Sequence, residues 1–528
     1  MVRCAALLLF FVVAGPAHAA PPDLAELPGP LVLTGGKEVP KDVAAAFFEL
    51  AGKDKARIVV IPTAIKDAED PDVVAEELKP WGDLKPASVT SLHTRERKTA
   101  DDPEFVKVLA DATGVWFCNG HTDRILNAYR GTLVEKELKR LHGRGVVIGA
   151  GGGGNAAIGT IAFAGGAEKP APALDVLPGF LVERKEQIVG AIADNPALVG
   201  LQIPDGAGVV IRGRTMRVIG DQPITIRIAK GAGKPAAAQV AKAGSIFDLF
   251  QLRRAALNRA AEQPFPPAKP KDAVVEKGTL VIVGGGGTTQ KIMDAFLTAA
   301  GGKDALIVVI PTTETAGPGD AAYLRKFGAT NVKVLFTTDR KLANDPTFSE
   351  ALMKAGGVWF GGGRQWRFVD SFEGALVQKR CHEVLARGGA IGGSSAGASI
   401  QSEYMPRGHP LGNTVMAAEG YEKGFGFLPG CAVDQHFFAR ERRADMTGLI
   451  QKYPQYLGIG IDESTAIVVT GSTAEVMGRS RVAFYDSKKK PRVNYEWDAA
   501  GRLVWFDADY EELTVGEKYD LKKRERIK

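Results

Sequence analysis

The sequence predicts two tandem α/β domains, each built on a mostly parallel sheet with helices on both faces. The 528-residue chain repeats itself: residues 115–120 match 358–363 and residues 58–63 match 307–312, with the paired blocks 243 and 249 positions apart. In both copies, short β-branched apolar runs alternate with amphipathic segments, the pattern of βαβ units. The chain is also too long for a single core.

The second copy shows the expected elements most clearly. Buried strands are expected at residues 281–283, 306–310, 332–336, 358–360 and 390–391. Helices are expected at residues 350–354 and 374–386. In an open α/β sheet the chemistry lies beyond the carboxyl ends of the strands. The glycine-rich stretches 361–363 and 392–397 would lie at that edge.

Composition divides the chain into five parts. Residues 1–19 read as a signal peptide, because Arg3 precedes a short apolar run and 17–19 is a small-x-small cleavage pattern, so we expect export to the periplasm or the outside. The degenerate copy spans 28–255, a Pro-rich linker 256–277 and the catalytic copy 278–478. Residues 479–528 alternate aromatic and polar residues, which predicts a small C-terminal β segment.

Charge and cysteine content exclude several classes of protein. The net charge of +6 is small, and the chain lacks long blocks of basic residues. We therefore expect no nucleic-acid partner, and no membrane contact after removal of the signal peptide. The mature chain keeps Cys118, Cys381 and Cys431, which cannot all pair within one chain, so we expect mostly free, buried thiols.

A candidate nucleophile lies in the second copy. Gly393-Ser394-Ser395-Ala396-Gly397 is a Gly-x-Ser-x-Gly motif directly after an apolar run, the pattern of a nucleophile elbow. The first copy has Gly152 opposite Ser395. The catalytic apparatus is therefore expected in the second copy.

A serine nucleophile needs a base within hydrogen-bond reach and a third group to orient that base. The second copy holds three histidines, of which His382 falls in a predicted helix and His409 in a Gly/Pro loop. His436 ends another predicted strand, which would project it toward Ser395. His436 is the favoured base.

Four segments occur in the order and approximate spacing of one family. They are residues 361–365, the elbow at Ser395, residues 434–437 followed by Arg440 and Arg442, and residues 458–466. Together, over roughly residues 278–470, they resemble the cyanophycinases, part of a serine peptidase family that also contains the α-aspartyl dipeptidases. The resemblance implies three-layer α/β/α sandwiches similar to class I glutamine amidotransferases.

The resemblance implies roles for individual residues. Ser395 would be the nucleophile, His436 the base and Glu463 the carboxylate that orients it, with Asp462 and Asp434 as competing candidates for that carboxylate. The backbone amides of Ala396 and of Gly362 or Gly363 would form the oxyanion hole. No metal is expected, because the sequence has no cluster of His, Cys and Asp at the spacing of metal ligands. No cofactor is expected either.

The family cleaves cyanophycin, a polyaspartate with arginine on its side-chain carboxyls, to β-aspartyl-arginine dipeptides. Arginine forks can hold carboxylates while an acidic residue meets a guanidinium. Five residues match the family's substrate-binding positions: Gln365, Asp434, Gln435, Arg440 and Arg442. The alternative for the arginines is ion pairing on a helix surface.

Two departures from the family pattern bear on the substrate. Asp445-Met446 stands where the family has a further Arg-Leu, and Gly363 stands where Asn or Asp is more usual. Substrate preference is therefore open to drift.

The first copy lacks the machinery. Lys185 aligns with His436 and Asp205 with Glu463, so this half is expected to be catalytically dead and to replace a second subunit in an internal pseudo-dimer.

Three functions remain in competition. The leading one is an exported serine-type exopeptidase that acts on cyanophycin. The others are a related serine dipeptidase for Asp-X or isoaspartyl peptides and a non-catalytic binding protein. An amidotransferase is disfavoured, because that chemistry normally uses a cysteine at the elbow.

Overall fold

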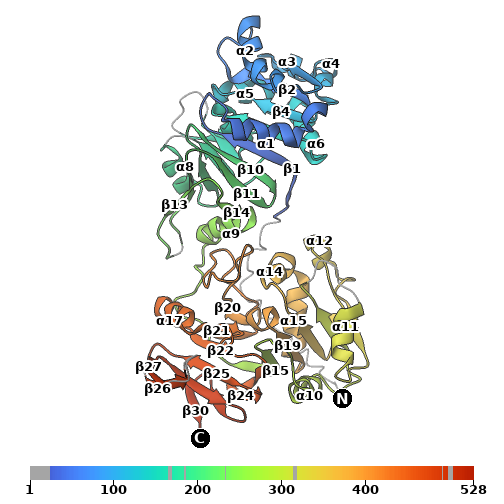
Figure 1. Ribbon diagram of the computed structural model, residues 1–528. Helices are drawn as coiled ribbons and strands as arrows, with labels where there is room; N and C mark the ends of the chain where they lie inside the picture. Colours follow the sequence, from blue (N-terminus) through green and yellow to red (C-terminus); the bar gives the residue numbers. More distant parts are fainter. Residues whose placement is uncertain are drawn as a thin grey trace, which may run out of the picture. The chain divides into compact units, whose positions relative to one another are not determined.

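The computed structural model describes residues 24–163, 169–183, 186–231, 233–312, 318–489, 492–497 and 503–528 (Figure 1). These residues divide into two compact units. The first unit comprises Leu24–Lys269 and Pro406–Lys423, and the second comprises Pro270–Met405 and Gly424–Lys528. Each repeat thus forms one unit, except for a segment of the second repeat that folds with the first.

The central sheet of the second unit begins with five parallel strands. In the described part of the chain the strand order is β17-β16-β18-β19-β15-β23-β24-β29-β30, with antiparallel pairing from β15 onward. The parallel strands are β15 (Val275–Val283), β16 (Ile307–Ile310), β17 (Val332–Val334), β18 (Gly357–Phe360) and β19 (Ala390–Ser394). The antiparallel ones are β23 (Thr465–Gly471), β24 (Thr473–Gly478), β29 (Lys518–Asp520) and β30 (Glu525–Ile527). The five strands predicted from apolar runs all overlap the parallel half of this mixed sheet.

Helices pack against this sheet and fix its layers. Both α10 (Gln290–Ala299) and α15 (Leu376–Ala386) contact β15, β18 and β19. Phe296 of α10 packs edge-on against Trp359, with ring centroids 5.0 Å apart. A Cβ on Gly392 would lie 2.7 Å from the Phe296 ring, so the glycine of β19 makes room for this helix. The remaining helices are α11 (Pro318–Arg325), α12 (Arg340–Ala343), α13 (Ala351–Lys354), α14 (Trp366–Phe372), α16 (Ala396–Ser399) and α17 (Arg443–Lys452).

A second sheet carries the other half of the candidate site. Its order is β20-β21-β22-β25-β28 among the described residues, with β20, β21 and β22 parallel. The strands are β20 (Ser402–Tyr404), β21 (Leu428–Gln435), β22 (Leu457–Ile461), β25 (Arg481–Tyr485) and β28 (Tyr510–Thr514). β21 ends directly before His436, and β22 ends two residues before Glu463. The sheet therefore delivers both side chains to one edge.

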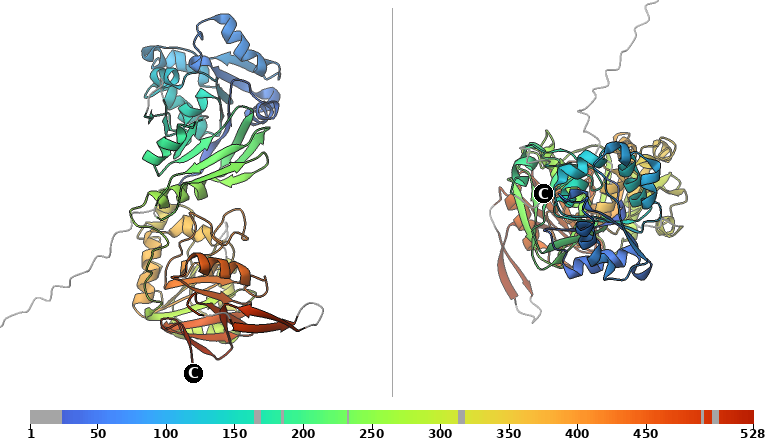
Figure 2. Two further views of the ribbon diagram at one scale, coloured as in Figure 1. Left: turned by 90° about the vertical axis from the view of Figure 1, so that its left-hand side faces the viewer. Right: turned by 90° about the horizontal axis from the view of Figure 1, so that it is seen from above.

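The C-terminal residues join both sheets of the second unit. β25 and β28 pair antiparallel in the smaller sheet, and β29 pairs with β24 in the larger one. Between them β26 (Arg492–Trp497) and β27 (Leu503–Ala508) form a hairpin (Figure 2). Most strands of the segment expected as a small β appendage are thus built into the two sheets of the second unit, whereas the β26–β27 hairpin forms a two-stranded sheet of its own.

The first unit repeats this topology. Within the described residues its larger sheet runs β14-β11-β10-β1-β5-β4-β2-β3, and a smaller one runs β13-β12-β9-β8. The larger sheet contains β1 (Leu27–Thr34), β2 (Arg57–Ile61), β3 (Ser88–Ser91), β4 (Gly114–Phe117), β5 (Val147–Gly151), β10 (Ala207–Gly213), β11 (Thr215–Gly220) and β14 (Ile246–Asp248). The smaller contains β8 (Phe180–Glu183), β9 (Val199–Gln202), β12 (Ile224–Ile228) and β13 (Ala237–Ala241).

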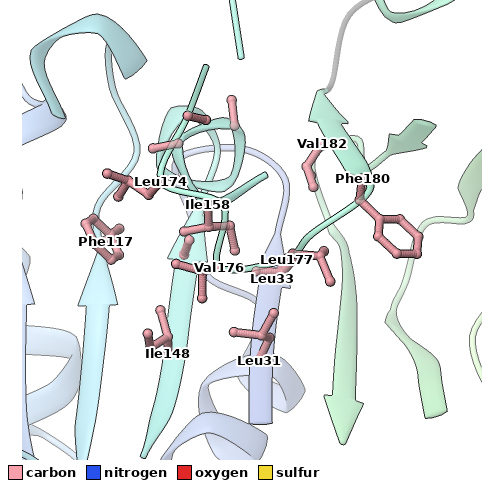
Figure 3. Packing of buried hydrophobic residues seen from close by; sticks show 14 of the residues in the cluster. Leu31, Leu33, Phe117, Ile148, Ile158, Leu174, Val176, Leu177, Phe180 and Val182 are labelled. Carbon is pink, nitrogen blue, oxygen red and sulfur yellow. The ribbon is translucent and has the colours of Figure 1, made fainter. Parts of the chain in front are cut away.

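Helices and a large apolar core complete the first unit. The helices include α1 (Lys41–Ala51), α2 (Pro71–Gly82), α5 (Thr122–Tyr129), α6 (Leu133–Gly143), α7 (Gly153–Ile158), α8 (Ile188–Asp194) and α9 (Leu249–Ala260). Leu31 and Leu33 of β1 pack with Ile148 of β5 under the loop that carries Val176 and Leu177 (Figure 3). All are buried.

The segment Pro406–Lys423 is clamped into the first unit by charged groups. Arg259, on α9, binds the Glu419 carboxylate through two hydrogen bonds of 2.7 and 2.9 Å. Lys234 pairs with the buried Glu422 at 2.5 Å. The guanidinium of Arg254 lies over the Tyr421 ring, 4.8 Å from its centroid. Paired and buried charges of this kind fix geometry strongly when all members are satisfied. These contacts explain why Pro406–Lys423, a part of the chain between Ser395 and His436 in sequence, folds with the first unit.

Other expectations meet the structure in part. Cys118, Cys381 and Cys431 are buried and unpaired, as expected. Residues 261–274 of the expected linker form neither helix nor strand. The expected signal peptide, residues 1–19, lies outside the described residues. In the part of the chain that is described, no helix has both the length and the apolar character needed to cross a bilayer.

Candidate active site

Ser395 occupies a sharp turn between β19 and α16. Its backbone has φ 58° and ψ −111°, outside the regions that non-glycine residues favour. The flanking glycines are required by close packing: a Cβ on Gly393 would lie 2.4 Å from the Gly397 carbonyl oxygen, and one on Gly397 would lie 2.1 Å from the Phe360 carbonyl oxygen. The motif thus forms a strained elbow of the kind found at functional sites.

The three residues proposed as a triad lie in hydrogen-bond contact. Ser395 Oγ lies 2.9 Å from His436 Nε2, and His436 Nδ1 lies 2.5 Å from Glu463 Oε1. His436 also has a positive φ of 51°. With Nδ1 protonated toward the carboxylate, Nε2 can accept the serine proton. This geometry can activate a serine hydroxyl.

The two competing carboxylates are engaged elsewhere. Asp462 accepts the backbone N–H of Ala439 at 3.0 Å and the Ser480 hydroxyl at 2.6 Å. Asp434 is fully buried and pairs with Arg442 at 2.9 Å. Of the three acidic candidates, only Glu463 is placed against the imidazole.

Burial and charge set the proton affinity of the base. Burial lowers the pKa of His436, and the hydrogen bond from the ring to Glu463 raises it in part. The nearby positive charges of Arg440 and Arg442 lower the pKa further. The imidazole is therefore held neutral, in the form that can take a proton, down to lower pH than a free histidine.

A glycine turn after β15 holds the backbone of all three segments. Three successive carbonyls accept backbone N–H groups: Val283 from Ser395 (3.0 Å), Gly284 from His436 (2.7 Å) and Gly285 from Ser464, the residue after Glu463 (2.7 Å). One short stretch of backbone thus holds Ser395, His436 and the residue after Glu463 in place through hydrogen bonds.

Side chains cannot replace these glycines. A Cβ on Gly285 would lie 2.3 Å from His436 Cε1, and one on Gly286 would lie 2.5 Å from the Glu463 Cβ. Gly284 would meet the Asp462 carbonyl oxygen at 2.2 Å. The sequence analysis did not predict a role for this turn. The run of glycines at 284–287, directly after a predicted strand, indicates a place where backbone segments approach closely.

The expected oxyanion hole lies beside the nucleophile. Gly362 and Gly363 follow β18, the neighbour of β19. A Cβ on Gly362 would lie 3.7 Å from the Ser395 Cβ, and both loop glycines are exposed. The amide of Ala396 is the first after the nucleophile, at the start of α16. The elements therefore bring the expected donors to the same edge as Ser395.

The five expected substrate-binding residues separate by exposure. Four are buried: Gln365 (2% exposed), Asp434 (0%), Gln435 (4%) and Arg442 (4%). Arg442 also donates to the Gln435 carbonyl oxygen at 2.6 Å. Arg440 is exposed, and its charge acts on the His436 imidazole. Arg440 is thus the member of the set whose side chain is exposed.

The first unit keeps the elbow but fills it differently. Gly152 has φ 46° and ψ −115°, close to the values at Ser395. Asn119, which aligns with Gly362, points its side-chain oxygen into this turn and accepts the Gly153 amide at 3.0 Å. That amide corresponds to Ala396. Asp205 lies beside Gly36, while Lys185 lies outside the described residues.

Comparison with known proteins follows this duplication. The sequence profile of peptidase family S51 matches residues 31–219 and 280–477, more than half of the chain. Cyanophycinase from Geminocystis herdmanii is 29% identical over 257 residues, covering 47% of this chain and 94% of that protein. Cyanophycinase from Synechococcus elongatus is 30% identical over 257 residues, covering 47% and 80%. The crystal structure of a peptidase from an acI-B1 actinobacterium matches with a TM-score of 0.35 and 20% identity, over 47% of this chain and 98% of that one.

Proposed function

The chain belongs to peptidase family S51 and is a serine-type peptidase, and from this we propose that it hydrolyses cyanophycin to β-aspartyl-arginine dipeptides through an acyl-enzyme on Ser395. The mechanism rests on two hydrogen bonds. Ser395 Oγ lies 2.9 Å from His436 Nε2, and His436 Nδ1 lies 2.5 Å from Glu463 Oε1. The substrate rests on the cyanophycinases to which the chain is similar.

Each residue has a defined part in the proposed reaction. Ser395 Oγ attacks the scissile carbonyl carbon while its proton passes to His436 Nε2. The amides of Ala396 and of Gly362 or Gly363 hold the oxyanion. His436 then protonates the leaving amine, and water releases the acyl group by the same route in reverse. Glu463 keeps the imidazole in the tautomer that this sequence needs.

Substrate recognition is proposed to divide between exposed and buried groups. The exposed Arg440 would hold an aspartate carboxylate of the polymer. The buried Asp434–Arg442 pair, with Gln435 and Gln365, would shape the wall behind it. Breaking such a buried pair leaves an uncompensated charge, so these residues are also expected to hold the loop that carries His436.

The direct test is dipeptide release from purified cyanophycin, followed by mass spectrometry. Ser395→Ala is expected to lower kcat by about 10⁴- to 10⁶-fold, because the triad acts as a unit. Ser394→Ala, one residue earlier, is the matched control and is expected to keep activity. Activity on Asp-X or isoaspartyl dipeptides but not on the polymer would replace the substrate. Release by Ser395→Ala at the wild-type rate would refute the mechanism.

Two further parts of the proposal concern assembly and location. We propose that the first unit stands in for a second subunit, so the mature protein should scatter light as a monomer, and a dimer through the catalytic halves would contradict this. The leader pattern at residues 1–19 supports export. Sequencing of the mature N-terminus should find cleavage after Ala19, and an intact Met1 would oppose it.

A further inference from the structure

The loop proposed to hold the oxyanion has little stiffness of its own. Gly361, Gly362 and Gly363 follow one another directly after β18. Glycine populates both signs of φ, so a peptide flanked by glycines can rotate at low cost. An oxyanion hole needs its N–H groups fixed in advance. Something outside the loop must therefore hold the peptide between Gly362 and Gly363.

Thr312 is placed to do this. Its Oγ1 donates to the carbonyl oxygen of Gly362 at 2.5 Å, and the residue is 4% exposed. The peptide group is planar and trans, so its C=O and N–H point in opposite directions. Fixing the Gly362 carbonyl on one side consequently fixes the Gly363 N–H on the other.

The fit between Thr312 and the loop is tight. Gly363 has φ 123°, and a Cβ on it would lie 2.0 Å from Thr312 Oγ1. The hydroxyl thus occupies the space that a side chain at position 363 would need. Thr312 is itself tied in place, because Arg367 Nη1 donates to its carbonyl oxygen at 3.0 Å. Gly363 stands where the family more often has Asn or Asp, and the absence of a side chain there leaves room for the Thr312 hydroxyl.

The first unit provides an internal contrast. Thr63 aligns with Thr312, but its hydroxyl lies 3.0 Å from His93 Nδ1 and 2.7 Å from the Tyr129 hydroxyl. The loop position of Gly362 is there taken by Asn119, whose oxygen binds the Gly153 amide. The contact between threonine and loop carbonyl is formed in the unit that has a serine at the elbow.

We propose that Thr312 is a positioning residue of the oxyanion hole, which acts by locking the Gly362–Gly363 peptide. The inference rests on the proposed acyl-enzyme mechanism. It predicts a defect in the chemical step with little change in substrate binding. Removing an oxyanion donor outright costs about 10²- to 10³-fold in kcat, so releasing the peptide that carries one should cost about 10- to 10²-fold.

The test compares Thr312→Val, which keeps the shape and loses the hydroxyl, with Thr312→Ser, which keeps the hydroxyl. We measure kcat and KM on cyanophycin and the rate of labelling by a fluorophore-linked fluorophosphonate. In that labelling Ser395 Oγ forms a bond to phosphorus, fluoride leaves, and the serine proton passes to His436. Thr312→Val should lower kcat and the labelling rate by about 10- to 10²-fold with KM within about threefold, and Thr312→Ser should restore both.

Matched controls separate the possible failures. Thr63→Val removes the equivalent hydroxyl in the first unit and should leave kcat and labelling unchanged. Wild-type kcat and labelling in Thr312→Val would overturn the inference, as would equal losses in Thr312→Val and Thr312→Ser that track a lower Tm. Ser395→Ala distinguishes these results from failure of the proposed function: if it still hydrolyses the polymer, the acyl-enzyme itself is wrong.

Discussion

The two elbows differ in side chains and hardly in backbone. Ser395 and Gly152 share the same unusual conformation, with φ of 58° and 46° and ψ of −111° and −115°. In the first unit, however, the carboxamide of Asn119 accepts the amide that corresponds to Ala396. The elbow is thus a property of the fold, produced by a strand that turns directly into a helix, and the chemistry is added to it.

The difference also shows how firmly the first site is closed. A Cβ on Gly152 would lie 1.8 Å from Asn119 Oδ1, so a serine at position 152 would require the Asn119 side chain to move. Holding a non-glycine residue in such a conformation costs about 1–3 kcal/mol, which Gly152 avoids. The glycine of the first unit thus avoids the backbone strain that Ser395 bears in the second.

Of the paired substitutions that compare the two units, the largest difference in kcat/KM is expected at the carboxylate that hydrogen-bonds to His436. Glu463→Gln replaces the hydrogen-bond acceptor of His436 Nδ1 and disturbs the tautomer, so kcat/KM should fall by about 10²- to 10⁴-fold. Asp205→Asn changes the aligned residue of the first unit and should leave kcat/KM unaltered. Steady-state kinetics of both variants measure this, and equal effects would show that the first unit takes part in the chemistry.

A smaller separation is expected at the glycine turns. Gly285→Ala would place a Cβ 2.3 Å from His436 Cε1 at φ 102°, and the ring would have to leave its position between Ser395 and Glu463. A displacement near 1 Å can cost about 10²-fold in kcat. Gly36→Ala in the first unit, at φ 76°, should instead lower the free energy of unfolding by about 1–3 kcal/mol and leave kcat intact.

Kinetics and urea unfolding of both alanine variants decide between these outcomes. A Gly285→Ala enzyme with wild-type kcat would show that the imidazole has room the structure does not indicate. Loss of kcat in Gly36→Ala, without unfolding, would show that the first turn supports the second active site.

How far the sequence could predict this molecule depends on the range of the interaction. Apolar periodicity located the parallel strands, because buried strands carry their signal locally. The motif around Ser395 located the elbow, because close backbone packing requires glycines at 393 and 397. The choice of Glu463 over Asp462 came from the family pattern, and only the hydrogen bonds of both residues distinguish them in space.

Long-range contacts left no local pattern. Nothing near Glu419 or Tyr421 indicates that Pro406–Lys423 folds with the first unit, because its partners Arg254 and Arg259 lie about one domain earlier in the chain. The burial of Arg442 against Asp434 was likewise hidden, since an arginine that binds substrate and one that pairs internally look alike in sequence. Asn119 aligned with Gly362, but its turn into the elbow depends on three-dimensional packing.

The smallest expected effect concerns the charge beside the base. A gap-free extension of the alignment of Lys185 with His436 places Val189 opposite Arg440, so Arg440→Val gives the second unit the side chain of the first. The positive charge of Arg440 lowers the pKa of His436, and its removal should raise that pKa. Catalysis needs the neutral imidazole, so kcat/KM rises as pH passes upward through this pKa. The acid limb of the profile should therefore move to higher pH in Arg440→Val, while Arg440→Lys, which keeps the charge, should hold it in place.

Because the same arginine is proposed to bind substrate carboxylate, KM on cyanophycin should rise as well in Arg440→Val, but by the same factor at every pH above the acid limb. A limb that stays fixed in Arg440→Val would mean that the charge of Arg440 has no measurable part, and that burial, Glu463 and Arg442 set the proton affinity of the base.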